Sequence, residues 1–272
     1  MTDDALLRDA TRPWTTEEKL HAAIHGPVFR DLLRRDSVVV ERDGWFQITT
    51  PSSRSVLNEV VLSRVAAEEA DRTIEEVVGH YRALGLPVKW CVGPWTELAD
   101  FGARLEARGF RFWDVRGMVC AAALALTVPS SVVVESVTAD NQAEFDATFV
   151  SGWDLGADAL AAFSLQHREV IERAPRRVLF FLARVDGAPA ATTALVLRDG
   201  PRPFGYLVGA QVLAAYRGRG IYRALIEARL AALRAEGITL AVTHARESTS
   251  APMLEHLGFE TAFRSRCYVL DA

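Results

Sequence analysis

The amino-acid sequence predicts an α+β protein made of two tandem domains, each with a mixed β-sheet flanked by helices. Its 272 residues exceed one average domain and suit two domains of about 130 residues. The C-terminal half alternates segments typical of strands and helices, and the N-terminal half repeats much of that order less clearly. Proline and paired serines in Leu126-Thr-Val-Pro-Ser-Ser131 separate an apolar run from a new β-branched start. We therefore expect one domain at residues 1–128 and a second at 129–272.

Ten segments are expected in the C-terminal half, in the order β-α-α-β-β-β-α-β-α-β. Phe145, Phe149 and Trp153 recur at helical spacing, Asp186-Gly187 is typical of a hairpin turn, and Gly237 is a helix stop. The expected strands are 132–137, 178–185, 188–197, 204–213, 238–243 and 260–270, and the expected helices are one through 145–153, then 157–173, 221–236 and 251–256.

The N-terminal half contains a vaguer version of this order. The expected helices are 14–34, 68–84 and 97–108, and the expected strands are 37–41, 45–49, 56–63, 88–92 and 111–118. Both halves end in a glycine-strand-helix-Gly-Phe segment, from Gly85 to Phe110 and from Gly237 to Phe259. This echo indicates an internal duplication.

Composition limits the classes of function. The chain is 50% hydrophobic and 24% charged, which excludes a disordered or collagen-like protein. A net charge of −4 gives no basic field for nucleic acid, and the longest apolar run, 118–126, is too short to span a membrane. Cys91, Cys120 and Cys267 lack metal-ligand spacing. With no secretory signal at the start, we expect a cytoplasmic protein with no metal, whose cysteines are buried free thiols.

The segment 212–225 carries the clearest chemical signal, because a strand runs into a loop of glycine and arginine that opens directly into a helix. The first amides of a helix have no internal partners, and the helix dipole adds positive potential there. Gly218 and Gly220 let the backbone approach a ligand. Cationic donors for phosphate oxygens come from Arg217, Arg219 and Arg223. The pattern predicts a phosphate or pyrophosphate site, although it is neither a P-loop nor a dinucleotide fingerprint.

Arg217-Gly-Arg-Gly-Ile-Tyr222 resembles the acyl-CoA loop of the GNAT superfamily of N-acyltransferases. The family pattern is Arg or Gln, two residues, Gly, one residue, then Gly or Ala; this chain departs from it only at Tyr222. Leu254-Glu-His-Leu-Gly-Phe259 resembles the second family signature, a short helix closing on Gly-Phe. The resemblance covers about 132–272, and the N-terminal half resembles a degenerate copy with an acidic, glycine-free stretch at 63–72.

The resemblance implies two tandem GNAT-like domains, each with a twisted, mostly antiparallel sheet that opens after its fourth strand. It implies acetyl-CoA or another acyl-CoA as co-substrate, and transfer of the acyl group by direct attack of an amine on a small molecule, peptide or protein. The implied pantetheine contacts are Gln211, Val212 and Leu213, and the implied phosphate contacts are Arg217, Gly218, Arg219, Gly220, Ile221 and Tyr222. Domain 1–128 would support and shape the substrate site of a catalytic domain at 129–272.

Candidates for the remaining roles follow from position. His244 ends a strand on the side where the sheet should open, and Glu247 follows it, so either could take the proton of the amine. A satisfied core histidine and a helix-capping glutamate are the alternatives. Trp153 and Asp154 end a helix that shapes the acceptor pocket in the family, and core packing explains Trp153 equally well. Many relatives place a tyrosine acid where this chain has Leu254.

Two other classes of function stay open. One is a regulatory module that binds CoA without turnover. The other is an enzyme of the same fold with a different reaction, such as a decarboxylase or an aminoacyl transferase.

Overall fold

The computed structural model describes residues 12–156 and 159–272, which divide into two compact units. The first unit contains Phe29–Leu32 and Val119–Thr243 together with the described residues up to Ala22. The second unit contains Ala23–Val28, Leu33–Met118 and His244–Ala272. Each unit therefore combines segments that are distant in the sequence.

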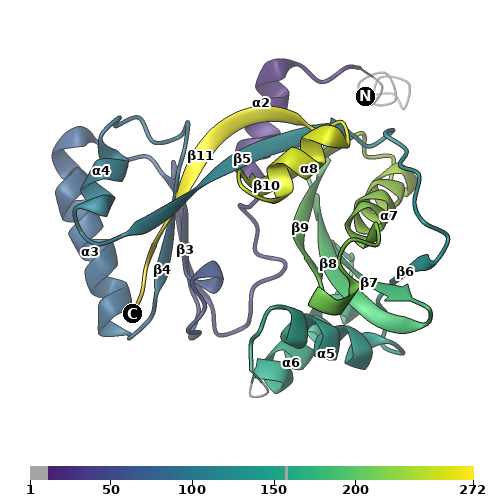
Figure 1. The fold of residues 1–272 in the computed structure, drawn as a ribbon. Coiled ribbons are helices and arrows are strands. Elements are labelled where there is room, and N and C mark those ends of the chain that lie inside the picture. The colour runs from purple at the N-terminus through teal and green to yellow at the C-terminus, as the bar shows by residue number, and fades with distance from the viewer. Residues whose placement is uncertain (1–11, 157–158) are drawn as a thin grey trace. The chain divides into compact units, whose positions relative to one another are not determined.

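The sheet of the first unit has the strand order β10-β9-β8-β7-β6. Its strands are β6 (Val132–Ser136), β7 (Val178–Val185), β8 (Ala188–Arg198), β9 (Phe204–Val212) and the start of β10 (Leu240–Arg246). Strands β6 to β9 pair antiparallel, and β10 runs parallel to β9 (Figure 1). This is the mixed sheet that the sequence predicts.

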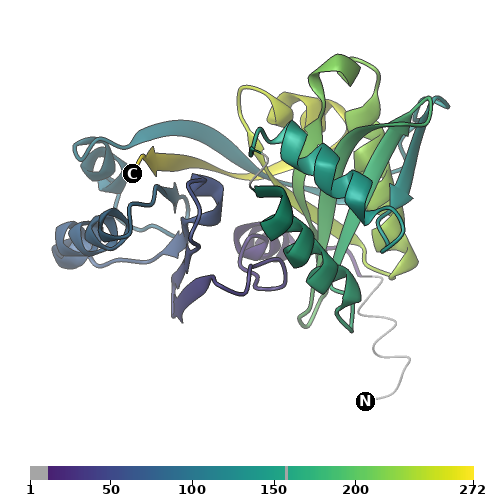
Figure 2. The ribbon, with the colours of Figure 1, turned by 90° about the horizontal axis from the view of Figure 1, so that it is seen from below.

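Helices cover both faces of this sheet. Helices α5 (Gln142–Gly152) and α6 (Ala159–Glu172) lie side by side against β7 and β8, and α7 (Ile221–Ala235) packs across β6 to β9 (Figures 1 and 2). Successive strand side chains point to opposite faces, so Phe180 meets α5, whereas Ala183 packs with residues of α7. The predicted helix 157–173 starts at two residues outside the described part of the chain, and its remainder is α6.

The sheet of the second unit has the strand order β1-β2-β3-β4-β11-β5. Its strands are β1 (Val38–Arg42), β2 (Trp45–Thr49), β3 (Glu59–Ser63), β4 (Val88–Val92), β11 (Glu260–Leu270) and β5 (Arg111–Ala121), and its helices are α3 (Ala70–Ala83), α4 (Phe101–Glu106) and α8 (Ser250–His256). The last strand of the chain thus lies between two strands of its N-terminal part, with Tyr268 opposite Trp90 (Figure 1). One buried core joins Trp90 and Tyr268 to the inner side chains of α3 and α4.

The helix predicted at 14–34 is wrong beyond His25. Helix α2 (Thr16–His25) begins at a capping box, in which the Glu18 amide donates to Thr15 Oγ1 and the Thr15 amide donates to Glu18 Oε2. It ends where Gly26-Pro27 follows, because proline removes an amide donor and disfavours a helical residue before it. The strand predicted at 56–63 starts only at Glu59, since a 3₁₀ turn (Ser55–Leu57) precedes it.

Candidate functional site

Strands β9 and β10 separate soon after they begin to pair. Their parallel register covers only Gly205 with Ala241 and Tyr206 with Val242, and Thr243 Oγ1 then donates to the Leu207 carbonyl at 2.9 Å. Strand β9 continues to Val212 and remains paired with β8. The second half of β9 therefore has backbone groups on one side that β10 does not use.

A β-bulge lies where the strands separate. The register of β8 and β9 shifts between Thr192 and Ala194, which places an extra residue of β9 beside Gly209. Gly209 has φ +42°, and a Cβ atom there would lie 3.4 Å from Cζ2 of Trp153. The Trp153 ring at the end of α5 thus covers the bulge, and Asp154 follows it with φ +52°. Gly209 was missed by the sequence analysis, although a glycine inside a strand pattern is a signal for a bulge.

The three candidate pantetheine residues have different backbone surroundings. The Leu213 amide donates to the Ala190 carbonyl at 2.9 Å, so Leu213 and Gln211 direct their backbone groups toward β8. By the same alternation, Val212 directs its N–H and C=O toward the opening. Arg217 Nε donates to the Val212 carbonyl at 3.2 Å. The structure therefore leaves the Val212 amide as the donor that faces the opening.

Two buried oxygen atoms lie on β8 and β9 beside this bulge. Gln211 Oε1 and Thr192 Oγ1 belong to directly opposed residues, and neither has a hydrogen-bond partner within the described residues. The Gln211 side chain packs so closely on Gly152 that a Cβ atom at residue 152 would overlap it. Glycine at the end of α5 is what lets Gln211 lie beside Trp153.

The loop after β9 presents a row of backbone amides. A 3₁₀ turn (Ala214–Tyr216) leads to Gly218 and Gly220, with φ +78° and +75°, and α7 begins at Ile221. The Ala224 amide donates to the Gly220 carbonyl at 3.1 Å, whereas the amides of residues 218–223 have no acceptor in the part of the chain that the structure describes. These amides lie at the positive end of a 15-residue helix. The arrangement suits an anion with several oxygen atoms.

Side chains around the loop add positive charge. The Arg219 guanidinium lies 5.6 Å from the centre of the Tyr216 ring, and Arg223 is exposed on the first turn of α7. No ion pair involves Arg217, Arg219 or Arg223 among the described residues. The Tyr222 side chain points inward, and burial raises the pKa of its phenol. Tyr222 therefore contributes its backbone amide to the loop, and not its side chain. At Gly220 a Cβ atom would lie 2.7 Å from Cγ of Pro129. The positive φ of this position would also strain any residue other than glycine.

His244 belongs to the second unit, and its ring is hydrogen-bonded to a backbone carbonyl. Its Nε2 lies 2.9 Å from the Ala23 carbonyl, and because a carbonyl only accepts, Nε2 carries the proton. Burial lowers the pKa of His244 to about 4. The ring is therefore neutral at pH 7 and weakly basic.

Glu247 also belongs to the second unit and is held in ion pairs. Arg116 binds both of its carboxylate oxygens, with Nε at 2.6 Å from Oε2, and Arg264 Nη1 lies 2.7 Å from the same oxygen. Hydrogen bonds from Arg116 lower the pKa of Glu247, so it remains an anion that attracts a proton weakly. Leu254 is buried, with 1% of its side chain exposed, and offers no acid.

The second unit contains a counterpart of the opening without an anion site. Strands β3 and β4 pair parallel only at Glu59 with Lys89 and Val60 with Trp90, and α3 then follows β3. Trp90 Nε1 donates to Ser63 Oγ at 2.9 Å inside this counterpart. The segment before and into α3 carries three acidic side chains, Glu68, Glu69 and Asp71. Carboxylates at this helix start repel a phosphate.

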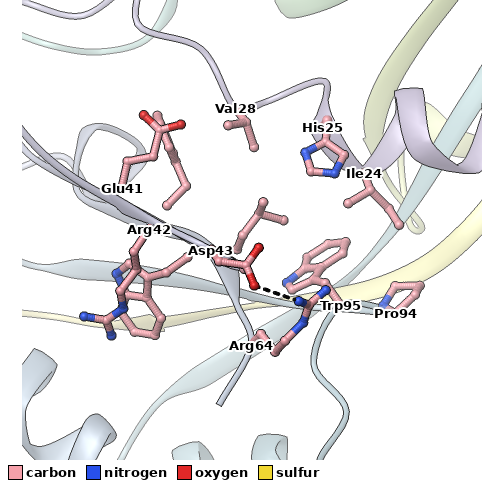
Figure 3. Close-up of a pocket in the computed structure, with 13 residues that line it drawn as sticks. Ile24, His25, Val28, Glu41, Arg42, Asp43, Arg64, Pro94 and Trp95 are labelled. Carbon is pink, nitrogen blue, oxygen red and sulfur yellow. Dashed lines mark hydrogen bonds and ion pairs between the residues drawn. The ribbon is translucent and has the colours of Figure 1, made fainter.

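A separate cavity of about 590 Å³ lies in the second unit (Figure 3). Ile24, His25 and Val28 line one side, and Asp43 and Trp95 lie across from them. Arg64 Nη1 forms an ion pair with Asp43 at 3.2 Å. Apolar and charged side chains therefore both line the cavity.

Two features are absent from the described part of the chain. No helix in residues 12–156 or 159–272 is long and apolar enough to cross a membrane. Over the same residues, no group of three or more His, Cys, Asp or Glu side chains is arranged to hold a metal ion.

Comparison with known proteins supports the fold. Residues 141–259 match the model of the acetyltransferase (GNAT) family. A search of curated protein sequences finds no match. A functionally unknown conserved protein from Staphylococcus epidermidis ATCC 12228 has a similar structure, with TM-score 0.65 and 12% identity over 90% of this chain and 98% of that chain.

Two further solved structures carry family names. A GCN5-related N-acetyltransferase from Kribbella flavida matches with TM-score 0.62 and 19% identity over 92% of this chain and 93% of its own. A tandem GNAT protein from the clavulanic acid biosynthesis pathway matches with TM-score 0.55 and 17% identity over 99% of this chain and 96% of its own. The predicted fold, two tandem GNAT-like domains, is confirmed.

Proposed function

We propose that this chain is an N-acetyltransferase, on the ground that residues 141–259 match the model of the GNAT acetyltransferase family. The proposed reaction moves an acetyl or other short acyl group from acyl-CoA to an amine of a small molecule, peptide or protein. We assign catalysis to residues 129–272, and a supporting, substrate-shaping role to residues 1–128.

One observation carries this proposal. Strand β9 leaves β10 and runs directly into the loop whose amides at residues 218–223 have no acceptor within the described residues. An extended chain with amide groups, such as the pantetheine arm of CoA, would pair with the Val212 backbone as an added strand does. The pyrophosphate at its end would then meet the amides, Arg219 and Arg223. Acyl-CoA supplies the activated thioester, and the residues of the opening hold it in place.

The acceptor side of the site is assigned to the end of α5. Trp153 covers the bulge at Gly209, and the Gln211 oxygen beside it is buried without a partner in the described residues. An attacking amine must be neutral and must lose a proton during the reaction. Since His244 has a pKa of about 4 and Glu247 is held by arginines, we assign the general-base role to neither side chain.

Charge reversal at the loop tests the cofactor site. We expect the double variant Arg219→Glu, Arg223→Glu to bind CoA roughly 100-fold more weakly in isothermal titration calorimetry, because two charge-assisted contacts are each worth about 1.5 kcal/mol or more. The matched control is Arg168→Glu, which makes the same change on the exposed face of α6. Unchanged affinity in the folded double variant would contradict the loop assignment. Saturation should give one CoA per chain, because the counterpart in the second unit is acidic.

Turnover distinguishes the proposed function from its alternatives. A thiol-release assay with acetyl-CoA and a panel of amines should show release that depends on one class of amine. CoA binding with no release on any amine would favour a regulatory module. Release of product without transfer to an amine would favour another reaction on the same fold.

A further inference from the structure

Two cysteines of the second unit lie directly opposite each other on neighbouring strands. Cys91 on β4 is the register partner of Cys267 on β11, and their Sγ atoms are 3.6 Å apart. Each side chain is 7% exposed, and both pack with Val115, Trp95 and Trp113. The structure holds both as free thiols.

The backbone at this pair already fits a disulfide. Opposed residues of an antiparallel pair have Cα atoms about 4.5–5.5 Å apart. Disulfides span Cα separations of about 4.4–6.8 Å. Rotation of the two side chains is therefore enough to bring the sulfur atoms from van der Waals contact to bonding distance, and the strands need not move.

The hydrogen bond between the two sulfur atoms shifts their pKa values in opposite directions. This hydrogen bond, together with the cations Lys89 and Arg246, lowers the pKa of Cys267 against the effect of burial. The same hydrogen bond and burial raise the pKa of Cys91. Lys89 Nζ is paired with Glu59 Oε1 at 2.6 Å, and the Arg246 guanidinium lies 4.4 Å from the centre of the Trp113 ring. Cys267 is thus the better nucleophile, and Cys91 is placed to resolve it.

We propose that Cys91 and Cys267 are a reversible redox pair that a hydroperoxide oxidises to a disulfide. The Cys267 thiolate attacks one peroxide oxygen, the O–O bond breaks, and Cys267 becomes a sulfenic acid while the peroxide leaves as water or an alcohol after taking up a proton. The Cys91 sulfur then attacks the sulfenic sulfur, the S–S bond forms, and the departing hydroxide takes the Cys91 proton to leave as water. A small dithiol reverses the reaction. The bond links β4 to β11.

The direct test uses the native full-length protein. After treatment with hydrogen peroxide and blocking of the remaining thiols with an alkylating reagent, we expect a mass that shows loss of two hydrogen atoms and one alkylated cysteine out of three. Peptide mapping should find Cys91 joined to Cys267, with Cys120 carrying the label. The oxidised protein should melt several degrees higher than the reduced one, because the bond closes a long loop. Dithiothreitol should restore the mass and the melting temperature.

Single variants separate the two roles. Cys120→Ser should form the disulfide as the wild type does. Cys91→Ser should instead accumulate a sulfenic acid at Cys267 that dimedone labels, whereas Cys267→Ser should give neither product. The proposal is overturned if the native wild type keeps three alkylatable thiols under these conditions, if Cys120 is oxidised first, or if the only disulfide formed joins two chains.

Discussion

At the scale of single residues, a buried carboxylate ties together helices α5 and α6 of the first unit. Asp146 on α5 is 1% exposed, and its Oδ1 lies 2.6 Å from Nδ1 of His167 on α6. Its Oδ2 accepts from Ser164 Oγ at 2.6 Å and from Gln142 Nε2 at 3.1 Å. Since an ionised carboxylate only accepts, His167 Nδ1 carries the proton. Phenylalanine rings surround the imidazole. The buried Asp146 carboxylate therefore finds its hydrogen-bond partners within α5 and α6.

The free energy of unfolding should depend on pH because of this network. Burial alone would raise the pKa of Asp146, but the hydrogen bonds from His167 and Ser164 outweigh it, and the pKa lies below its usual value. A depressed pKa in the folded state contributes stability that is present above pH 4 and is lost as the pH falls through the folded-state pKa. We expect Asp146→Asn to lower the free energy of unfolding by about 3 kcal/mol at pH 7, because it removes the charge of a buried pair.

The difference in the free energy of unfolding between wild type and Asp146→Asn should stay constant down to about pH 4 and become smaller below it. Denaturant unfolding at several pH values measures this difference. Asp140→Asn, an exposed residue before α5, is the matched control and should stay close to wild type. A difference that does not depend on pH would show that the charge of Asp146 contributes nothing.

At the scale of elements, two helical glycines of the second unit have opposite surroundings. Gly79 lies in the middle of α3, is exposed, and has no atom within 4 Å of the place where a Cβ atom would stand. Gly102 lies in the first turn of α4, where a Cβ atom would overlap the hydroxyl of Tyr268, a side chain that is 1% exposed. The first glycine costs helix stability for no packing reason, whereas the second makes room for β11.

Alanine should therefore act with opposite sign at these two positions. Gly79→Ala should raise the free energy of unfolding by about 0.5–1 kcal/mol, since alanine has less conformational entropy to lose in a helix. Gly102→Ala should lower it by about 1–3 kcal/mol through overpacking against a rigid ring. Thermal and denaturant unfolding of both variants measure the difference. Equal effects of the same sign would contradict the packing described for α4 and β11.

Local patterns in the sequence were sufficient to predict most elements, including the glycine loop that precedes α7, but not the pairing of β11. Hydrophobic periodicity and turn residues mark helix α7 and the loop before it, because these depend on neighbours in sequence. Nothing local specifies that 260–270 lies between β4 and β5, since strand pairing depends on residues far along the chain. For the same reason, position alone made His244 and Glu247 candidates, while the Ala23 carbonyl and Arg116 decide their chemistry.

At the scale of the whole molecule, the first and last parts of the chain share one sheet and one core. Both neighbours of β11, strands β4 and β5, come from residues before 129. Tyr268 is buried in the core that Trp90 and the inner faces of α3 and α4 complete. The N-terminal part is therefore required to bury the C-terminal strand.

Expression of Ser130–Ala272 alone tests this dependence. We expect an insoluble fragment, or one without cooperative unfolding, because β11 loses both neighbours and exposes its apolar face. Residues 1–129 and 130–272 produced together as two chains should instead form a soluble complex that binds CoA. A soluble, monomeric 130–272 fragment that melts cooperatively by calorimetry would refute the dependence.

The place of β11 also couples folding to the end of protein synthesis. The ribosome makes β4 and β5 long before Glu260–Leu270. In the nascent chain, the edges of β4 and β5 that later pair with β11 therefore have no partner strand. Unpaired strand edges bind other strands and favour aggregation. A chaperone that shields β4 and β5 during translation would protect the nascent chain, and a stop codon placed before residue 260 would leave it with those edges permanently open.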